Sequence, residues 1–486
     1  KGVGANFTLA DCQKQAEKIT NKYKKDEDIN IEQIQDDVED FLMQSKEYDA
    51  ARAYIKYREK QKHDREHPWS DNDERQDLIL QKYLIKGENK KDFLKRIALG
   101  KPTLEKTFRK KEAIFGGRNL YAIGREGNIT GSNCYVTEDP QDNLESIYKV
   151  DYQIARTYSY GGGQGMNLSN IRPKGAKVNN SSNTTPGVMV FAEKYSHTTL
   201  NTQQDARRGA LMLVLNISHP DIIDFITTKL DLSKVNGANI SIALTDDFMK
   251  AARDDKEWIM EFETPYETIQ KKVNAKELLK LVGYAAHTMG DPGVVFIDHM
   301  NDYHFLSEYD EVKFTATNPC GEQPLMAHGS CNLGSINLNA FVKNPFTNEA
   351  KYDFDRFDFV TTEMIWALDD LLTLLGDRHA LPEQRDHVTQ YREIGLGVMG
   401  LADLALSMKL PYGSKLFLEF LDKLMKKMLN TAAKASALRA KEMGVFPKYD
   451  YDKVSKSSFY KTAIDSETDE LVKKYGGSFS GEHGDG

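Results

Sequence analysis

The sequence predicts an α/β protein with a small helical region at its N-terminal end. Apolar, β-prone segments alternate along the chain with amphipathic segments of helical spacing, the former at 211–215, 240–244 and 293–297 and the latter at 359–375 and 416–441. Such alternation is typical of an α/β domain. The first 66 residues are instead highly charged, with apolar residues at helical spacing. We therefore predict three parts: a helical region at 1–66, an α/β domain at 67–475 and a flexible tail at 476–486.

Composition argues against several classes of protein. The 486 residues include no apolar run near the roughly 18 to 20 residues that a membrane helix needs. The formal net charge of −8 argues against a generic nucleic-acid binder, which normally carries a basic face. Four cysteines are too few for a disulfide scaffold. We expect a cytoplasmic protein with reduced thiols and without a nucleic-acid or membrane partner, and we expect the polar tract at 179–185 to be a surface loop.

One short segment concentrates groups that can do chemistry. Asn318-Pro319-Cys320-Gly321-Glu322 is followed, eleven positions after Cys320, by Cys331. If the segment is extended, Cys320 and Glu322 point to the same face, because side chains alternate along a strand. The alternative is that both cysteines are buried core thiols, as most unpaired cysteines are. A zinc site is disfavoured, since the segment has no C-x-x-C spacing and only His328 nearby, and we expect no metal in this chain.

A third cysteine precedes another β-prone run. Cys134 lies in the segment 131–136, at the expected end of a strand. It is 197 positions away from Cys331, so only a long-range fold could bring the two together. Pairing them would require Cα atoms within roughly 7 Å.

Ordered motifs around these cysteines resemble the catalytic (large) subunit of ribonucleotide reductase. The resemblance runs from about residue 75 to about residue 460. Its motifs are the segments 132–136, 160–169, 207–212, 219–221, 318–325, 330–338 and 394–403.

The resemblance implies a role for each of five residues. A thiyl radical on Cys320 would remove the 3′ hydrogen of the ribose, Glu322 would take the proton of the 3′ hydroxyl as general base, and Asn318 would hold a ribose hydroxyl. Cys134 and Cys331 would be the reducing pair, one of them protonating the departing 2′ hydroxyl. Together they would supply two electrons and become a disulfide, which thioredoxin or glutaredoxin would reduce by exchange.

The glycine-rich segment 161–165 has no phosphate-loop signature, because the Lys-Ser/Thr ending is missing. Glycines alone are equally typical of turns. The resemblance places this segment along the substrate pocket, with Ser159, Gly163 and Asn133 near the bound ribonucleotide.

The resemblance also implies nucleotide effectors. Asp142 matches an acidic residue that binds the ribose of a specificity effector, although a helix N-cap is an equally good interpretation. Lys234 and Asn236 lie in the segment 231–239, which resembles a mobile loop that responds to the effector, although Asn-Gly is also an ordinary turn signal. The segments 31–43 and 48–58 resemble the later helices of an ATP cone, which binds ATP or dATP; Cys12 in this region is interpreted as structural or incidental.

The fold implied by the resemblance is a ten-stranded α/β barrel with Cys320 on a central finger loop, in a homodimer. The family's last barrel strands, its phosphate-binding Pro-Thr-Gly-Ser/Thr loop, its radical-relaying tyrosine pair and its C-terminal cysteine pair have no counterpart in this sequence. We therefore expect the barrel to be incomplete at its C-terminal end. Either a complementary C-terminal chain or an unseen region supplies the remaining part of the barrel, or this polypeptide alone is not competent for catalysis.

Three functions remain open from the sequence. The form of the segment 318–325 and the segment 115–119 look more like the adenosylcobalamin-dependent class II reductases than class I. The alternative is a class I large subunit, which needs a radical-generating small subunit that holds the metal cofactor. A non-catalytic, effector-binding fragment or paralogue is the third possibility, and the retained Cys134, Cys320, Glu322 and Cys331 argue against it. Diphosphate and triphosphate substrates are not distinguished.

Overall fold

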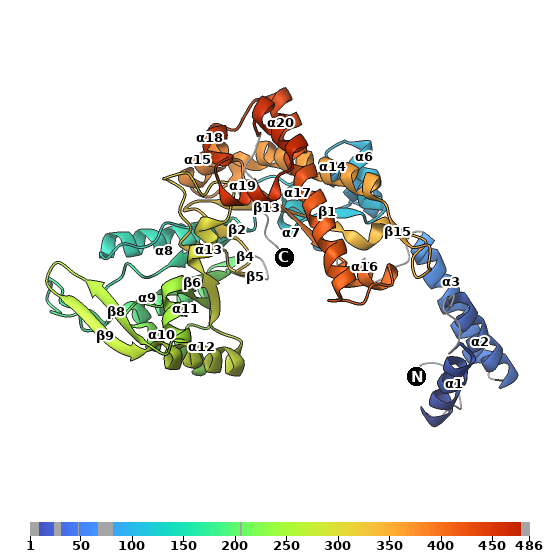
Figure 1. Ribbon diagram of the computed structural model, residues 1–486, viewed down its shortest axis with the longest axis horizontal. Helices are drawn as coiled ribbons and strands as arrows, with labels where there is room; N and C mark the ends of the chain where they lie inside the picture. Colours follow the sequence, from blue (N-terminus) through green and yellow to red (C-terminus); the bar gives the residue numbers. More distant parts are fainter. Residues whose placement is uncertain (1–8, 24–30, 47, 67–80, 205–206, 478–486) are drawn as a thin grey trace. The chain divides into compact units, whose positions relative to one another are not determined.

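The computed structural model describes residues 9–23, 31–46, 48–66, 81–204 and 207–477 (Figure 1). The chain forms two compact units. Unit 1 comprises Lys1–Ala113, Asn337–Phe357 and Gly400–Phe420, and unit 2 comprises Ile114–Ile336, Asp358–Met399 and Leu421–Gly486. Most of the predicted tail, from residue 478 onward, and the side chain of Cys12 lie outside the described part of the structure.

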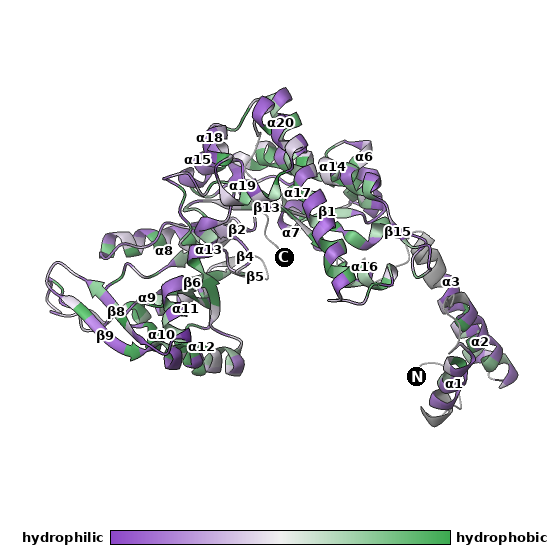
Figure 2. Cartoon of the chain, in the orientation of Figure 1, coloured by the Kyte–Doolittle hydropathy of each residue, from purple (hydrophilic) through white to green (hydrophobic). Residues whose placement is uncertain are grey.

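Unit 1 begins with the predicted N-terminal helices. Arg58 joins two of them, because its guanidinium lies 2.6 Å from the Asp36 carboxylate and 3.0 Å from that of Glu39. Both hydrophilic and hydrophobic residues occur along these helices (Figure 2). The elements that start in unit 1 are α1 (Leu9–Tyr23), α2 (Ile31–Gln44), α3 (Tyr48–Glu66), α5 (Lys90–Ile97), α6 (Pro102–Arg109), β1 (Ala113–Phe115), η2 (Leu338–Phe341), β14 (Val342–Lys343), β15 (Lys351–Tyr352), α14 (Phe354–Leu375), α16 (Leu401–Ser407) and α17 (Lys415–Met443).

The central sheet has eight strands in the order β1-β13-β2-β3-β6-β7-β10, with β16 also paired to β13. Strands β2, β3, β6, β7 and β10 are mutually parallel, and β13 is antiparallel to β2. The bounds are β2 (Cys134–Val136), β3 (Gly163–Asn167), β6 (Leu211–Asn216), β7 (Asn239–Leu244), β10 (Gly293–Phe296), β13 (Ser330–Asn337) and β16 (Ile394–Met399). The barrel that the resemblance implies has ten strands, so the eight-stranded sheet of the described residues corresponds to part of it.

Helices cover one face of this sheet. Leu211, Leu213 and Leu215 of β6 are buried in a cluster with the helices, whereas Met212 and Val214 belong to a cluster on the opposite face. Fully burying a leucine side chain contributes roughly 1.5–3 kcal/mol. The leucines of β6 therefore determine which face of the sheet packs against the helices, here called the outer face, and the opposite face is the inner one. The helices on the outer face are α8 (Leu144–Ser159), α9 (Val188–Asn201), α10 (Ile222–Thr227), α11 (Asp246–Arg253) and α12 (Ala275–Met289).

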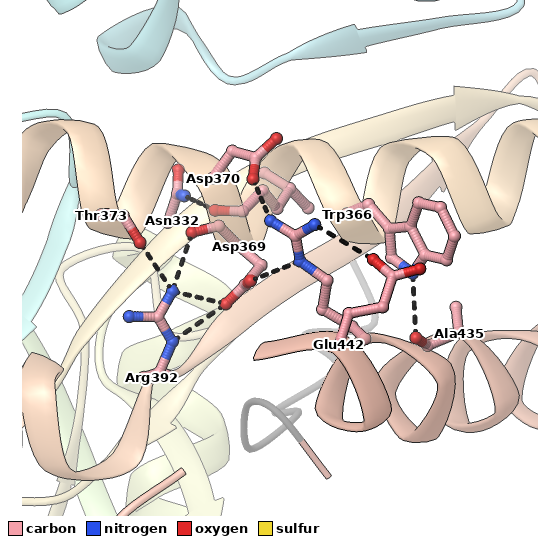
Figure 3. Close-up of polar contacts among 10 residues, drawn as sticks. Asn332, Trp366, Asp369, Asp370, Thr373, Arg392, Ala435 and Glu442 are labelled. Atoms are coloured by element: carbon pink, nitrogen blue, oxygen red, sulfur yellow. Dashed lines mark hydrogen bonds and ion pairs between the residues drawn. The ribbon is translucent and has the colours of Figure 1, made fainter. Parts of the chain in front are cut away.

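The C-terminal helices are joined through a buried carboxylate on α14 (Figure 3). Asp369 accepts hydrogen bonds from Arg392 at 2.6 and 2.9 Å and from Arg439 of α17 at 3.2 Å. One residue earlier on α14, the carbonyl of Leu368 accepts a hydrogen bond from the Asn332 amide at 2.8 Å. Because Asn332 belongs to β13, these contacts tie α14, α17 and the approach to β16 to that strand.

The remaining elements complete unit 2. A long hairpin of β8 (Glu257–Glu263) and β9 (Thr268–Asn274) lies at the left of Figure 1. The polar tract 179–184 is exposed, as predicted for a surface loop. The other elements are α7 (Gly117–Ala122), β4 (Gln203–Gln204), β5 (Arg207–Arg208), η1 (Thr228–Leu230), α13 (Ile297–Asp302), β11 (Ala316–Thr317), β12 (Pro324–Leu325), η3 (Gly376–Arg378), α15 (Pro382–Tyr391), α18 (Tyr451–Val454), α19 (Ser458–Ala463) and α20 (Ser466–Tyr475). No helix among the described residues is long and apolar enough to cross a membrane.

Candidate active site

A short hairpin carries Cys320 onto the inner face of the sheet. Strands β11 and β12 pair antiparallel, with Ala316 opposite Leu325. Both of these side chains are buried in the cluster that contains the inward-facing residues of β2, β6, β7, β10 and β13. The hairpin is therefore held by apolar contacts at its base, and the loop 318–323 forms its tip.

The tip of the hairpin is a β-turn. The Gly321 amide donates to the Asn318 carbonyl at 3.0 Å, which makes Pro319 and Cys320 the two central residues. Asn, Pro and Gly are favoured at the first, second and fourth positions of a type I turn, and Gly321 adopts a positive φ of 84°. The segment is thus not extended, because proline and glycine close a turn, and the strand geometry that would point Cys320 and Glu322 to the same face does not apply here.

The two other described cysteines lie directly opposite each other. Cys134 is the first residue of β2, and its partner across the antiparallel β2–β13 pair is Cys331. Directly opposite residues of an antiparallel pair have Cα atoms about 4.5–5.5 Å apart, which is within the range that a disulfide spans. Both thiols are buried, whereas Cys320 is exposed. The structure therefore brings together the cysteine pair that the sequence could only suggest.

Asn318 and Glu322 connect the hairpin to this pair. The Asn318 side-chain amide donates to Cys134 Sγ at 2.9 Å, and its oxygen accepts from the Gln323 amide at 3.0 Å. The Cys134 thiol lies 3.8 Å from Glu322 Oε1, as a weak donor. The second oxygen of Glu322, Oε2, is buried and has no hydrogen-bond partner in the described part of the chain. A buried acceptor of this kind is suited to a proton or hydroxyl from a bound molecule.

The environment keeps the thiols protonated. Burial, followed by the nearby Glu322 carboxylate, raises the pKa of Cys134 far above its ordinary value. The same two causes, in the same order, raise the pKa of Cys320. A thiolate would be disfavoured both by desolvation and by a like charge. At neutral pH the site therefore presents S–H groups, which suits hydrogen-atom transfer and not nucleophilic attack.

Two glycines of β3 make room for the hairpin. A Cβ atom at Gly163 would lie 2.7 Å from Pro319 Cγ, and one at Gly165 would lie 1.8 Å from the Thr317 carbonyl oxygen. Contacts under 3.0 Å are essentially never seen for real Cβ atoms. The glycine-rich segment thus permits close approach of the hairpin backbone.

Two family models match this chain. Residues 132–480 match the barrel domain of ribonucleotide reductase, and residues 3–63 match the ATP cone domain. The chain belongs to the ribonucleotide reductase family. The resemblance drawn from the motifs is confirmed, as is the ATP-cone-like character of the N-terminal helices, and the mixed α/β sheet agrees with part of a reductase barrel.

Several curated ribonucleotide reductases are similar to this chain. The vitamin B12-dependent ribonucleoside-diphosphate reductase of Thermoplasma acidophilum is 31% identical over 91% of this chain and 68% of the relative. The enzyme of that name from Mycobacterium tuberculosis is 35% identical over 67% of this chain and 46% of the relative. The ribonucleoside-diphosphate reductase large chain of Neurospora crassa is 25% identical over 67% of this chain and 38% of the relative. This chain therefore spans about two thirds of the first relative and less than half of the other two.

The predicted substrate residues lie at different places in this chain. Gly163 is beside the hairpin, and its amide donates to the Asn133 carbonyl at 2.8 Å. This bond joins Asn133, the residue before Cys134, to the start of β3. Ser159 is exposed at the end of α8, where its hydroxyl donates to the Arg156 carbonyl at 2.7 Å. Contact of any of these residues with a nucleotide stays a prediction.

The predicted effector residues lie outside the thiol cluster. Asp142 is not the cap of α8, because Asn143 takes that place and accepts from the Ser146 amide at 2.8 Å. The Asp142 carboxylate instead accepts from the side chain of Arg172 at 2.7 Å and from its backbone amide at 3.0 Å. The capping interpretation of Asp142 was wrong, and its role toward an effector stays a prediction.

The segment 231–239 contains the turn that its Asn-Gly pair indicated, at 236–237. Lys234 and Asn236 are both exposed there, and the Lys234 ammonium lies 3.6 Å from the Asp231 carboxylate. Their role in effector binding is likewise still a prediction.

Sequence reasoning missed two anchors of the hairpin. The Asn167 amide at the end of β3 donates to the Thr315 carbonyl at 2.8 Å, and the Asn239 amide of β7 donates to the Pro319 carbonyl at 2.9 Å. Each joins residues that are far apart in the chain. No local spacing or composition signal identifies such a pair, since only the parallel order of the strands brings them together.

Proposed function

We propose that this protein reduces ribonucleotides to 2′-deoxyribonucleotides by thiyl-radical chemistry, with adenosylcobalamin as the radical source. One observation supports this most directly: Cys320 stands exposed at a turn beside a buried, cross-strand pair of thiols. The named vitamin B12 dependence of the Thermoplasma and Mycobacterium relatives supports the choice of cofactor.

The residues present fit a radical source delivered to the hairpin tip. When bound, adenosylcobalamin supplies a radical that removes a hydrogen atom from a thiol. Cys320 is the exposed thiol that would face it, and the raised pKa keeps its S–H bond intact.

The chain's own residues then divide the work. The Cys320 radical removes the 3′ hydrogen of the ribose, and Glu322 accepts the 3′ hydroxyl proton through the oxygen that lacks a partner among the described residues. Asn318 holds a ribose hydroxyl, and in the structure it holds Cys134 in place. Each group must come within hydrogen-bond reach of the substrate in the bound pose.

The buried pair supplies the reduction. Cys134 and Cys331 give up two protons and two electrons, the 2′ hydroxyl leaves as water, and a disulfide forms between the two sulfur atoms. The hydrogen taken by Cys320 then returns to the 3′ carbon, which restores the Cys320 radical, and Glu322 returns its proton to the 3′ oxygen. The raised pKa of Cys134 keeps this thiol protonated, and a protonated thiol is what proton donation to the leaving hydroxyl requires. Thioredoxin, glutaredoxin or an added dithiol then restores the pair by exchange, as a reduced, cytoplasmic setting allows.

A homodimer through α8 is part of the proposal. Leu144, Tyr148 and Tyr152 recur at four-residue intervals on one helix face and are 55%, 57% and 62% exposed. An apolar stripe of this kind is typical of an interface. Asp142 lies directly before Asn143, the N-cap of this helix. This supports an effector site at the edge of the same interface, with ATP, dATP or another deoxyribonucleotide as ligand.

A class I mechanism is the second candidate. The similarity to the Neurospora large chain favours it, and a separate radical-generating subunit would then hold the metal cofactor. The two candidates are distinguished by deoxyribonucleotide formation from the four ribonucleotides, as di- and triphosphates, by the full-length protein with dithiothreitol. We expect product only when adenosylcobalamin is added. Product that forms with a metal-containing partner subunit, and not with the cobalamin, would establish class I instead.

A further inference from the structure

Asn239 ties the turn that carries Cys320 to strand β7. Asn239 is the first residue of β7, and its side-chain amide donates to the carbonyl of Pro319 at 2.9 Å. Its neighbour in register on β6 is Met212, whose Cε lies 3.6 Å from the position of a Cβ on Gly321. The adjacent ends of β6 and β7 therefore lie beneath the turn.

The Pro319 carbonyl determines how Cys320 is presented. The peptide unit between Pro319 and Cys320 is planar, so fixing its oxygen fixes the direction from which the Cys320 Cα leaves the turn. The bond from the Gly321 amide to Asn318 lies within the turn and holds its shape. It does not hold the turn against the sheet.

Two other polar contacts of the tip are made to the buried Cys134 thiol. Asn318 donates to Cys134, and Glu322 accepts from it. The Asn239 bond is made instead to the residue directly before Cys320, from a different strand. The tip is thus held from two sides, by β2 and by β7.

We propose that Asn239 is a positioning residue for Cys320: its amide, by holding the Pro319 carbonyl, sets the orientation of the Cys320 sulfur toward the ribose. This inference rests on the proposed function for its catalytic consequence, although the positioning itself is a property of the free protein. Misplacing a reacting atom by about 1 Å can cost roughly a hundredfold in rate. A side chain that fixes one peptide plane can therefore matter for turnover without touching the substrate.

Because Asn239 is exposed, the effects of substituting it can be assigned to the lost hydrogen bond. Its side chain is exposed, so replacing it opens no cavity in the core. Asn239→Leu keeps a similar size and neutral charge but cannot donate, Asn239→Ala removes the side chain, and Asn239→Gln retains an amide donor. Ser241→Ala, two residues further along β7, is the control on the same strand; Ser241 is buried and lies opposite Gly293 of β10 in the strand register.

The experiment has two readouts on the full-length protein. The first is the rate of iodoacetamide alkylation at Cys320, followed on its own peptide by mass spectrometry, without nucleotide or cofactor. The second is steady-state reduction, separated into kcat and KM. We expect Asn239→Leu and Asn239→Ala to alkylate at least about threefold faster and to lose roughly tenfold in kcat with KM within about twofold, as expected for one neutral hydrogen bond. Asn239→Gln should recover part of both.

The proposal would be overturned if Asn239→Leu had the same Cys320 alkylation rate and kcat as the wild-type protein. It would also be overturned if Ser241→Ala changed both quantities as much as Asn239→Leu does. The two hypotheses also fail separately. A wild-type protein that makes no deoxyribonucleotide contradicts the proposed function, while the alkylation rates still decide whether Asn239 positions Cys320. An unfolded Asn239→Leu, detected by its thermal transition, would leave the decision to Asn239→Ala and Asn239→Gln.

Discussion

Substituting Gly165 by alanine tests how closely the hairpin must lie against β3. The new Cβ would lie 1.8 Å from the Thr317 carbonyl oxygen, and the shortest distance that real Cβ atoms adopt is about 3.0 Å. The hairpin or the strand must therefore move by about 1.2 Å, the difference of these two values. The obstacle is backbone and not a flexible side chain, so the movement cannot be absorbed by a rotamer change.

The displaced hairpin carries Cys320, and a shift of about 1 Å at a reacting group can cost roughly a hundredfold in rate. We expect Gly165→Ala to lower kcat by about that factor and to lower the free energy of unfolding by about 1–3 kcal/mol, as overpacked cores do. Turnover would be measured together with urea unfolding and with alkylation of Cys320, which reports a moved turn in the absence of substrate.

A matched control is available on α12. Gly283 is an exposed helical glycine, and no atom lies within 4 Å of the position of its Cβ. Gly283→Ala should leave turnover unchanged and stabilise the protein by roughly 0.5–1 kcal/mol, through the better helix propensity of alanine. Wild-type turnover in Gly165→Ala would refute the reasoning, because the hairpin would then tolerate the displacement.

Three further predictions concern the thiols and the fold. Mild oxidation of the protein with diamide should join Cys134 to Cys331, seen as a loss of two mass units in the linked peptides; failure to find that pair would contradict the cross-strand register. Glu322→Gln should speed alkylation of Cys320 at pH 8, because removing the carboxylate charge lowers the raised pKa of this thiol and increases its thiolate fraction. If the alkylation rate kept the same pH dependence in Glu322→Gln, the Glu322 charge would not be a cause of the raised pKa. Asp369→Asn should lower the free energy of unfolding by about 2–4 kcal/mol, because two arginines lose a buried carboxylate, and a change under about 0.5 kcal/mol in urea unfolding would contradict this.

Local patterns in the sequence predicted several of the main strands and helices. The apolar runs at 211–215, 240–244 and 293–297 correspond to β6, β7 and β10, and the amphipathic segments at 359–375 and 416–441 lie within α14 and α17. Such elements follow from the spacing of apolar residues, which is a local property. Unit 1 was not foreseen as it stands, because it combines the N-terminal region with 337–357 and 400–420, and no local signal links segments so far apart.

The site could be predicted only in part. The motifs identified Cys320, Glu322 and Asn318, which are close in the sequence, and the structure gathers them in one turn. The placement of Cys134 opposite Cys331 depends on strand register, which tertiary packing fixes. The glycines of the segment 161–165 were interpreted as typical of turns or as part of the substrate pocket, and their close approach to the hairpin was not predicted.

The measurement that tests the central claim most directly is deoxyribonucleotide formation by Cys320→Ser beside the wild-type protein, with adenosylcobalamin and dithiothreitol. A serine O–H bond is much stronger than a thiol S–H bond, so the hydroxyl cannot take the place of the thiol in hydrogen-atom transfer. We predict no detectable turnover by Cys320→Ser, while ribonucleotide affinity stays within about twofold of the wild-type value, because the substitution changes a single atom at an exposed turn. Substantial turnover by Cys320→Ser would contradict the assignment of the radical to Cys320.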